Sequence, residues 1–205
     1  MIYLKFKRFY DFVLAFLGIV ILSPLLIVLI VLIKLDSKGP IIFRQKRVGK
    51  DKKHFNIYKF RTMKIDTPKN TPTHLLENPD QWITRIGKIM RKTSLDEIPQ
   101  FLNILKGDMS FVGPRPALWN QYDLIKERDK YNVHKVLPGV TGWAQVNGRD
   151  ELLIPDKAKL DGEYLNHLNL LTDIKLVLKT FIVEFKNDGV VEGGTGTIEK
   201  ETSNN

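Results

Sequence analysis

The sequence predicts an α/β fold: a single membrane-associated domain with an N-terminal re-entrant membrane helix, amphipathic interfacial helices and a small β element. Three observations lead to this prediction. An apolar run without a charged side chain extends from Phe12 to Ile33. Two short segments typical of strands follow it, on either side of a basic turn. Helical apolar periodicity then recurs along much of the remaining chain.

The apolar run is long enough to cross a bilayer, but basic residues flank both of its ends. At ~1.5 Å per residue it would measure roughly 33 Å. The basic residues are Lys5, Lys7 and Arg8 before the run, and Lys34, Lys38, Arg44, Lys46 and Arg47 after it. Positive residues favour the cytoplasmic side. A helix broken at Ser23 and Pro24 would dip into one leaflet and return, because proline removes a backbone donor and the serine hydroxyl can bond a freed carbonyl. A single span with a proline kink is the alternative.

Length and composition favour one compact domain with anionic partners. The chain has 205 residues, a formal charge of +9 and no cysteine. We expect the re-entrant helix over residues 1–35, the catalytic domain over 36–188 and a disordered tail over 189–205. The charge indicates phosphorylated substrates, anionic lipid or nucleic acid. Without cysteine, disulfides and thiolate chemistry are excluded, and the four histidines lack the spacing of a helical zinc pair.

Turn residues and apolar patterns predict the elements of the domain. Strands are expected over residues 41–43 and 55–58, around a turn at Gly49, followed by a polar loop over 66–79. The expected helices cover residues 82–92, 95–105 and 118–130, with a last one over 174–185 that has Thr172 as its N-cap. The helix over 82–92 is basic and amphipathic, so it can lie on a membrane surface or pack one face on the core.

Two adjacent carboxylates, Asp96 and Glu97, follow Arg91 at the expected start of a helix. One explanation is structural: Ser94 and Glu97 have the spacing of a capping box, and the helix dipole favours acidic residues in a first turn. The other is catalytic. The helix N-terminus and Arg91 would keep Asp96 ionised, as a nucleophile toward phosphorus or a magnesium ligand. The spacing alone leaves both open.

Further candidates for phosphate binding are cations in stiff loops. Lys59 and Arg61 follow a predicted strand, Arg115 stands between two prolines, and Arg149 closes a segment whose glycines permit close backbone approach. Arginine pairs with phosphate oxygens in a bidentate manner, and rigid presentation lowers the ordering cost of binding. Each residue alone is more often a surface cation, because exposed charges are common, but several together in stiff loops favour phosphate binding.

Seven motifs occur in a fixed order along the chain. They are the Ser23-Pro24 break and the segments 37–40, 43–47, 59–63, 91–100, 113–116 and 138–142. Together they resemble the bacterial sugar transferase family, and more specifically its small monotopic phosphoglycosyl transferases. The likeness covers about residues 5–186.

The resemblance implies transfer of a sugar-1-phosphate from a UDP-sugar, expected to be N-acetylated, to polyprenol phosphate, expected to be undecaprenyl phosphate. It implies a covalent aspartyl-phosphosugar intermediate and release of UMP, as the first membrane step of capsule, exopolysaccharide or glycoprotein glycan synthesis. Asp96 would be the nucleophile and Glu97 its partner, both available to Mg²⁺. Arg91, Arg115 and Arg149 match positions that face phosphate in the family.

The implied location is the cytoplasmic face of the bacterial plasma (inner) membrane, with a monotopic topology. The expected partners are the UDP-sugar, the polyprenol phosphate, membrane lipid and downstream glycosyltransferases, and no nucleic acid. Two rivals remain open from the residues alone. One is a non-catalytic, membrane-tethered basic module that binds anionic lipid or nucleic acid. The other is a structural anchor for a biosynthetic complex.

Overall fold

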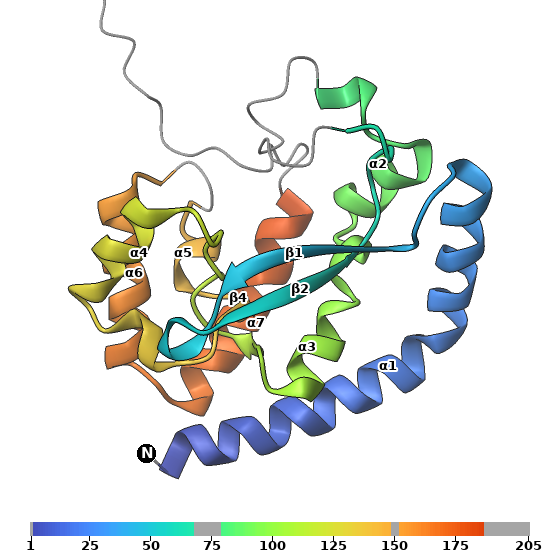
Figure 1. The fold of residues 1–205 in the computed structure, drawn as a ribbon. Coiled ribbons are helices and arrows are strands. Elements are labelled where there is room, and N and C mark those ends of the chain that lie inside the picture. The colour runs from blue at the N-terminus through green and yellow to red at the C-terminus, as the bar shows by residue number, and fades with distance from the viewer. Residues whose placement is uncertain (1, 68–78, 149–151, 187–205) are drawn as a thin grey trace, which may run out of the picture.

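A long bent helix lies against a body of shorter helices and two small β-ribbons in the computed structural model (Figure 1). The structure describes residues 2–67, 79–148 and 152–186. The predicted tail over 189–205, Arg149 and most of the predicted loop over 66–79 lie outside these residues. The mixture of helices with small sheets agrees with the predicted α/β class.

The β element consists of two separate pairs of strands. β1 (Ile42–Val48) and β2 (His54–Phe60) are antiparallel, with Arg44 opposite Tyr58. Both predicted strands are therefore confirmed, and each is longer than expected. β3 (Ser110–Val112) and β4 (Gly139–Thr141) form a parallel pair that the sequence did not predict.

Helix α1 (Ile2–Asp36) contains the whole apolar run, with Pro24 inside it. Pro24 has no N–H to offer the carbonyl of Val20, four residues earlier. The hydroxyl of Ser23 donates to that carbonyl instead, at 2.8 Å. This confirms the predicted local role of the serine. By length and composition alone, α1 is apolar enough to cross a membrane.

Helix α3 (Gln100–Lys106) lies inside the angle that α1 makes (Figure 1). Small residues on the inner side of α1 allow this close approach. Ala15 is fully buried with Ile104 and Met109. A Cβ atom at Gly18 would lie 2.7 Å from the ring of Phe101, so that only glycine leaves room for this ring. The bend of α1 is thus shaped around the helix that follows the two carboxylates.

The first part of α1 is fixed to the domain by buried polar contacts. Lys7 forms an ion pair with Asp173, and the hydroxyls of Tyr3, Tyr10 and Tyr164 donate to the same carboxylate at 2.6, 3.0 and 2.8 Å. Arg8 donates to the carbonyls of Ile104 and Leu105 at the end of α3. The last carbonyls of a helix lack i+4 partners, so the guanidinium supplies donors to them, and the Ile104 carbonyl also accepts from the N–H of Gly107 at 3.1 Å.

The last turn of α1 is fixed in the same way. The guanidinium of Arg61 is buried and donates to the carbonyls of Ile33, Ser37 and Lys38. The carboxylate of Asp36 accepts from the backbone N–H of Ile86 at 3.0 Å, in the first turn of α2. Both ends of α1 therefore contact the same domain.

The remaining helices differ in detail from the expected bounds. They are α2 (Arg85–Lys92), α4 (Tyr122–Asp129), α5 (Trp143–Val146), α6 (Ile154–Asn166) and α7 (Leu170–Lys186), with short 3-10 turns between them. Helices α5 and α6 were not predicted. The predicted N-cap at Thr172 is wrong, because α7 begins two residues earlier and the side chain of Asn169 accepts from the Thr172 N–H at 2.9 Å.

We predict that Asp173→Asn lowers the free energy of unfolding by about 3–5 kcal/mol, because it leaves the buried ammonium of Lys7 without its counter-charge. The two side chains of this pair are 7% and 4% exposed. Chemical unfolding in detergent micelles measures the change. The matched control is Asp129→Asn, which breaks a pair with Lys52. In this pair the side chain of Asp129 is 45% exposed and that of Lys52 is 50% exposed. Its cost should be about 0–1 kcal/mol. Equal losses in the two variants would contradict the clamping role.

Candidate active site

The two carboxylates lie on η4 (Leu95–Glu97), a single 3-10 turn between α2 and α3. Ser94 precedes it in the left-handed conformation, with φ at 53°, and makes no capping hydrogen bond with its side chain. The capping-box prediction is therefore wrong. The predicted α-helical N-terminus at Asp96 is also wrong, because a three-residue 3-10 turn occupies this place. Ile98 and Pro99 then keep a right-handed helical backbone up to the start of α3.

Two cations from other segments meet this turn. The ammonium of Lys59, near the end of β2, lies 2.8 Å from Oε1 of Glu97 and 3.8 Å from Oδ2 of Asp96. The guanidinium of Arg115 donates to the same Oε1 atom at 2.9 Å. The side chains of Asp96, Lys59 and Glu97 are only 4%, 13% and 16% exposed. The fold thus assembles four of the predicted site residues, which we call the acid cluster: Lys59, Asp96, Glu97 and Arg115.

Hydrogen bonds between β2 and α3 fix the position of Lys59 relative to Asp96 and Glu97. The side chain of Asn103, on α3, is fully buried against the edge of β2. It accepts from the N–H of Tyr58 at 2.9 Å and donates to the carbonyl of Asn56 at 2.8 Å. The strand that carries Lys59 is therefore tied to the helix that follows Asp96.

Glu97 is a carboxylate whose charge is strongly stabilised. Burial alone would raise its pKa, but the positive charges of Arg115 and Lys59 outweigh this effect and hold the pKa well below its usual range. Glu97 is consequently ionised at neutral pH.

Arg115 is presented by a loop that two strands hold in place. Val48 of β1 donates its N–H to the carbonyl of Ala117 at 2.9 Å, and Gly139 of β4 donates to that of Pro114 at 3.0 Å. A Cβ atom at Gly139 would lie 2.1 Å from the nitrogen of Gly113. The predicted close approach of glycine backbone is confirmed, and its partner is the arginine loop itself.

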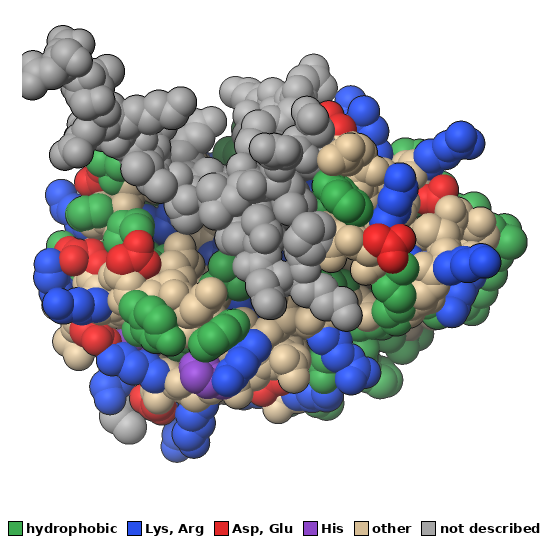
Figure 2. All heavy atoms as spheres, turned by 45° about the horizontal axis from the view of Figure 1, so that its top comes forward, with side chains coloured by type: hydrophobic (Ala, Val, Ile, Leu, Met, Phe, Trp, Pro, Cys, Tyr) green, Lys and Arg blue, Asp and Glu red, His purple; other side chains and the backbone are tan. Residues whose placement is uncertain are grey.

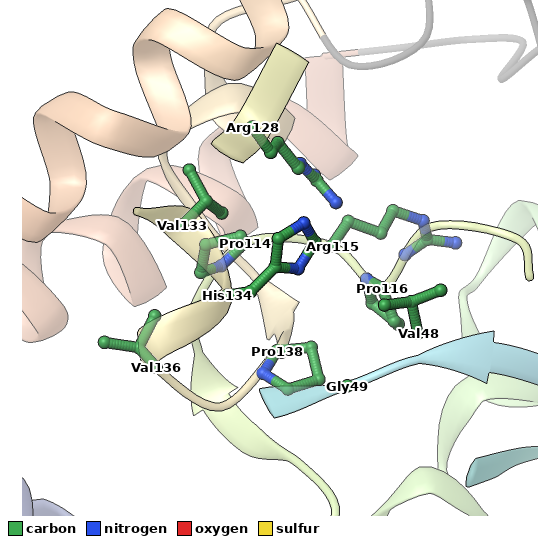
Figure 3. A pocket seen from close by; sticks show the side chains of 10 residues that line it. All are labelled: Val48, Gly49, Pro114, Arg115, Pro116, Arg128, Val133, His134, Val136 and Pro138. Atoms are coloured by element: carbon green, nitrogen blue, oxygen red, sulfur yellow. The ribbon is translucent and has the colours of Figure 1, made fainter. Parts of the chain in front are cut away.

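A small hollow lies behind this loop, lined in part by valine and proline side chains (Figure 3). Figure 3 shows Arg115 pointing away from Val133 and Val136 on its far wall. Arg128 in its upper part is paired with the buried Asp161 at 2.6 Å. Burial lowers the pKa of His134, which is therefore neutral at pH 7. The arginine loop thus forms one wall of this hollow, through Pro114, Arg115 and Pro116.

The other predicted phosphate ligands are Arg91, Arg61 and Arg149. Arg91, on α2, donates its Nε to the hydroxyl of Thr62 at 2.9 Å. Arg61 has its described contacts with the end of α1, apart from the acid cluster. The sequence contained an indication that a cation would bind the end of α1, because the last four carbonyls of a helix have no intrahelical donors. Arg149 lies outside the described residues.

A buried apolar cluster lies next to the acid cluster, and apolar side chains are exposed on α1 and α7. Leu95, next to Asp96, packs on the cluster that contains Leu29 and Ile33 of α1 and Met90 of α2. In Figure 2, Lys and Arg side chains are spread over the visible face, and hydrophobic side chains gather at its right edge, where Figure 1 places α1. Helix α7 exposes a second apolar stripe, made of Leu171, Ile174, Leu178, Phe181 and Ile182. Helix α2 packs one face on the core, through Met90 and Ile86.

The carboxylates of the acid cluster offer a partial site for a divalent cation. Within residues 2–67, 79–148 and 152–186, no three His, Cys, Asp or Glu side chains gather into a metal-binding group. Mg²⁺ is commonly held by one or two carboxylates together with substrate phosphates and water. Asp96 and Glu97 fit that mode of binding, and they do not form a complete protein cage.

Comparison with known proteins identifies the family. Residues 2–187 match the bacterial sugar transferase family. The chain belongs to this family. The match extends over nearly all of the residues that the structure describes, so the family fold includes α1 as well as the acid cluster.

Relatives within the family act on different sugars. The chain is 43% identical over 189 residues to the UDP-glucose:undecaprenyl-phosphate glucose-1-phosphate transferase of Escherichia coli, covering 88% of this chain and 40% of that protein. It is 40% identical over 186 residues to the UDP-N-acetylgalactosamine-undecaprenyl-phosphate N-acetylgalactosaminephosphotransferase of Aeromonas hydrophila, covering 87% of this chain and 43% of the relative. The chain thus spans about two-fifths of the length of these relatives. It matches EpsL of Bacillus subtilis, an uncharacterized sugar transferase, at 36% identity over 96% of this chain and 95% of the relative.

We predict that Glu97→Gln destabilises the protein at pH 7 and that the difference from wild type shrinks on acidification. The pKa of Glu97 is depressed in the folded state, so its stabilisation is fully present above the unfolded pKa of about 4.3 and declines as the pH falls below it. Thermal unfolding between pH 7 and pH 3 measures the difference. The control is Glu127→Gln, which breaks an exposed pair with Lys130. A loss at Glu97 that does not change with pH would contradict the assignment.

Proposed function

We propose that this chain transfers a sugar-1-phosphate from a UDP-sugar to a polyprenol phosphate, releasing UMP. The observation that carries the proposal is the acid cluster, in which two carboxylates and two cations from separate segments meet beside α1. A phosphoryl transfer between two anionic substrates needs both a nucleophile and counter-charges. The names of the relatives, which act on UDP-sugars and undecaprenyl phosphate, agree with this chemistry.

In the first step, a carboxylate oxygen of Asp96 attacks the β-phosphorus of the donor. A bond forms between the aspartyl oxygen and phosphorus, and the bond from phosphorus to the bridging oxygen breaks, so that UMP leaves with the electron pair. The product is an acyl phosphate that carries the sugar. In the second step, a phosphate oxygen of the polyprenol phosphate attacks the same phosphorus and releases Asp96.

The other members of the acid cluster prepare Asp96 for this role. Glu97 holds Lys59 and Arg115 at the site, since both cations share its Oε1 atom. Arg115 and Lys59 can then turn toward phosphate oxygens of the donor. The side chain of Asp96 is 4% exposed, so donor entry requires the site to open. Arg91 and Arg149 are proposed as further phosphate ligands.

Mg²⁺ is the proposed metal, and Asp96 and Glu97 would hold it. When bound, it would screen the charge of the diphosphate. Retention of full activity in excess chelator would show that the arginines and Lys59 are sufficient.

The donor sugar is proposed to be N-acetylated, and the pathway to be capsule, exopolysaccharide or glycoprotein glycan synthesis, with downstream glycosyltransferases extending the product. Two relatives of nearly equal identity are named for glucose and for N-acetylgalactosamine. UMP release measured over a panel of UDP-sugars separates these donors.

We propose a monotopic arrangement at the cytoplasmic face of the bacterial plasma membrane. The two ends of α1 contact one domain, through Arg8 and Lys7 at the start and Arg61 and Asp36 at the end. A helix that crossed the bilayer would place its ends on opposite sides, where a single domain could not contact both. The exposed stripe of α7 is proposed to lie in the membrane interface, as amphipathic helices do.

We predict that single cysteines at Lys5 and at Lys52 are both protected from an impermeant thiol reagent added to intact cells, because both ends of α1 face the cytosol. The absence of native cysteine makes the labelling specific. Labelling of both after permeabilisation is the control for reactivity. Labelling of either from outside would contradict the re-entrant topology. Pro24→Ala should shift part of the population toward a spanning helix.

We predict that Asp96→Asn remains folded and membrane-bound but loses at least a thousandfold in turnover, because an amide is not a nucleophile toward phosphorus. It should not acquire label from a UDP-sugar radiolabelled in the β-phosphate, whereas wild type does. Glu97→Gln should slow turnover and retain some labelling. The control Asp129→Asn, outside the site, should match wild type. Transfer by Asp96→Asn at a near-wild-type rate, free of deamidated protein, would rule out Asp96 as the nucleophile.

A further inference from the structure

The ammonium of Lys59 occupies the position from which a metal cation could contact both carboxylates of the acid cluster. Its ammonium lies within 4 Å of an oxygen of each, at 2.8 Å from Glu97 and 3.8 Å from Asp96. The side chain is 13% exposed and extends from β2, which Asn103 ties to α3. The position is therefore defined by the fold and does not depend on a freely moving surface lysine.

The acid cluster contains charges of both signs. Asp96 and Glu97 carry two negative charges, and Lys59 and Arg115 carry two positive charges. A divalent cation that entered alone would come close to two positive groups, and a diphosphate that entered alone would come close to two carboxylates. Because charges at these distances interact strongly in a partly buried site, each is disfavoured without the other. A cation and a diphosphate that arrive together leave the total charge unchanged.

We propose that Lys59 is the resident counter-ion of the acid pair, and that a divalent cation binds this chain together with the donor diphosphate and not before it. The inference rests on the proposed function, which supplies the diphosphate. With the diphosphate bound, the ammonium of Lys59 would pair with a phosphate oxygen instead of Glu97, and Asp96 and Glu97 would then be free to hold the cation, which would screen the diphosphate charge. Lys59 keeps its proton throughout, so the exchange breaks and forms only ionic contacts.

This arrangement requires reciprocal coupling between nucleotide and metal. If UDP raises the affinity for the cation by some factor, the cation raises the affinity for UDP by the same factor. In a site whose metal position is already formed without nucleotide, UDP would change the affinity for the cation very little. Removing the charge of Lys59 should convert this chain into such a site, because no ammonium then lies beside the two carboxylates.

The test measures Mn²⁺ binding by electron paramagnetic resonance with the purified full chain in nanodiscs, with and without UDP as the diphosphate probe. Wild type should bind Mn²⁺ at least tenfold more tightly when UDP is present. Lys59→Met should bind Mn²⁺ without UDP at least tenfold more tightly than wild type, and UDP should then add little. Lys59→Arg keeps the charge and should retain the wild-type coupling.

The matched control is Lys52→Met, which removes a lysine that is also paired with a carboxylate, Asp129, but lies on an exposed turn. It should bind Mn²⁺ as wild type does. Mn²⁺ affinity of wild type that is unchanged by UDP would overturn the inference, even if Lys59→Met failed to fold. So would an affinity of Lys59→Met no higher than that of wild type. UMP release by wild type in the same preparation tests the proposed function separately, so an active transferase without this coupling would contradict the inference alone.

Discussion

The packing of α3 inside the angle of α1 is the constraint on which the rest of the structure depends. Gly18 leaves space for the ring of Phe101, and Ala15 for Ile104, so α3 can sit against the inner side of the bend. The proline removes one backbone hydrogen bond and the Ser23 hydroxyl satisfies the carbonyl that remains. At the bend, the Ser23 hydroxyl replaces the missing backbone hydrogen bond, and the side chains of α3 fill the space on the inner side. The turn with Asp96 and Glu97 immediately precedes α3, so the packing of α3 on α1 links the long apolar helix to the acid cluster.

Polar contacts fix the two ends of α1 to the domain. They account for three of the cations in this sequence. Lys7 and Arg8 face a carboxylate and helix carbonyls, and Arg61 faces carbonyls at the other end. Each would be costly to bury without these partners. Part of the positive charge thus serves the architecture. Two other cations, Lys59 and Arg115, meet the carboxylates of the acid cluster.

The acid cluster shows how stability and chemistry share the same residues. Glu97 is held ionised by two cations, and those cations are in turn kept in place by Glu97. The loop of Arg115 is held between β1 and β4, and Lys59 is held through β2 and α3. The segments that carry these charges are therefore fixed by backbone hydrogen bonds and by the side chain of Asn103, and the charged side chains extend from them.

The sequence by itself determined the long apolar helix with Pro24 inside it and the β1–β2 hairpin. These features are encoded locally, in periodicity, in turn residues and in the geometry that proline imposes. The tertiary structure alone decided which cation meets which partner. Arg61 and Lys59 are two residues apart, and the alternation of a regular strand would place them on one face. Because β2 ends at Phe60, Arg61 lies beyond the strand and reaches the carbonyls of α1, whereas Lys59 reaches the carboxylates. It also replaced the expected cap at Ser94 by a left-handed turn and paired β3 with β4, since long-range packing overrides local propensity where the two conflict.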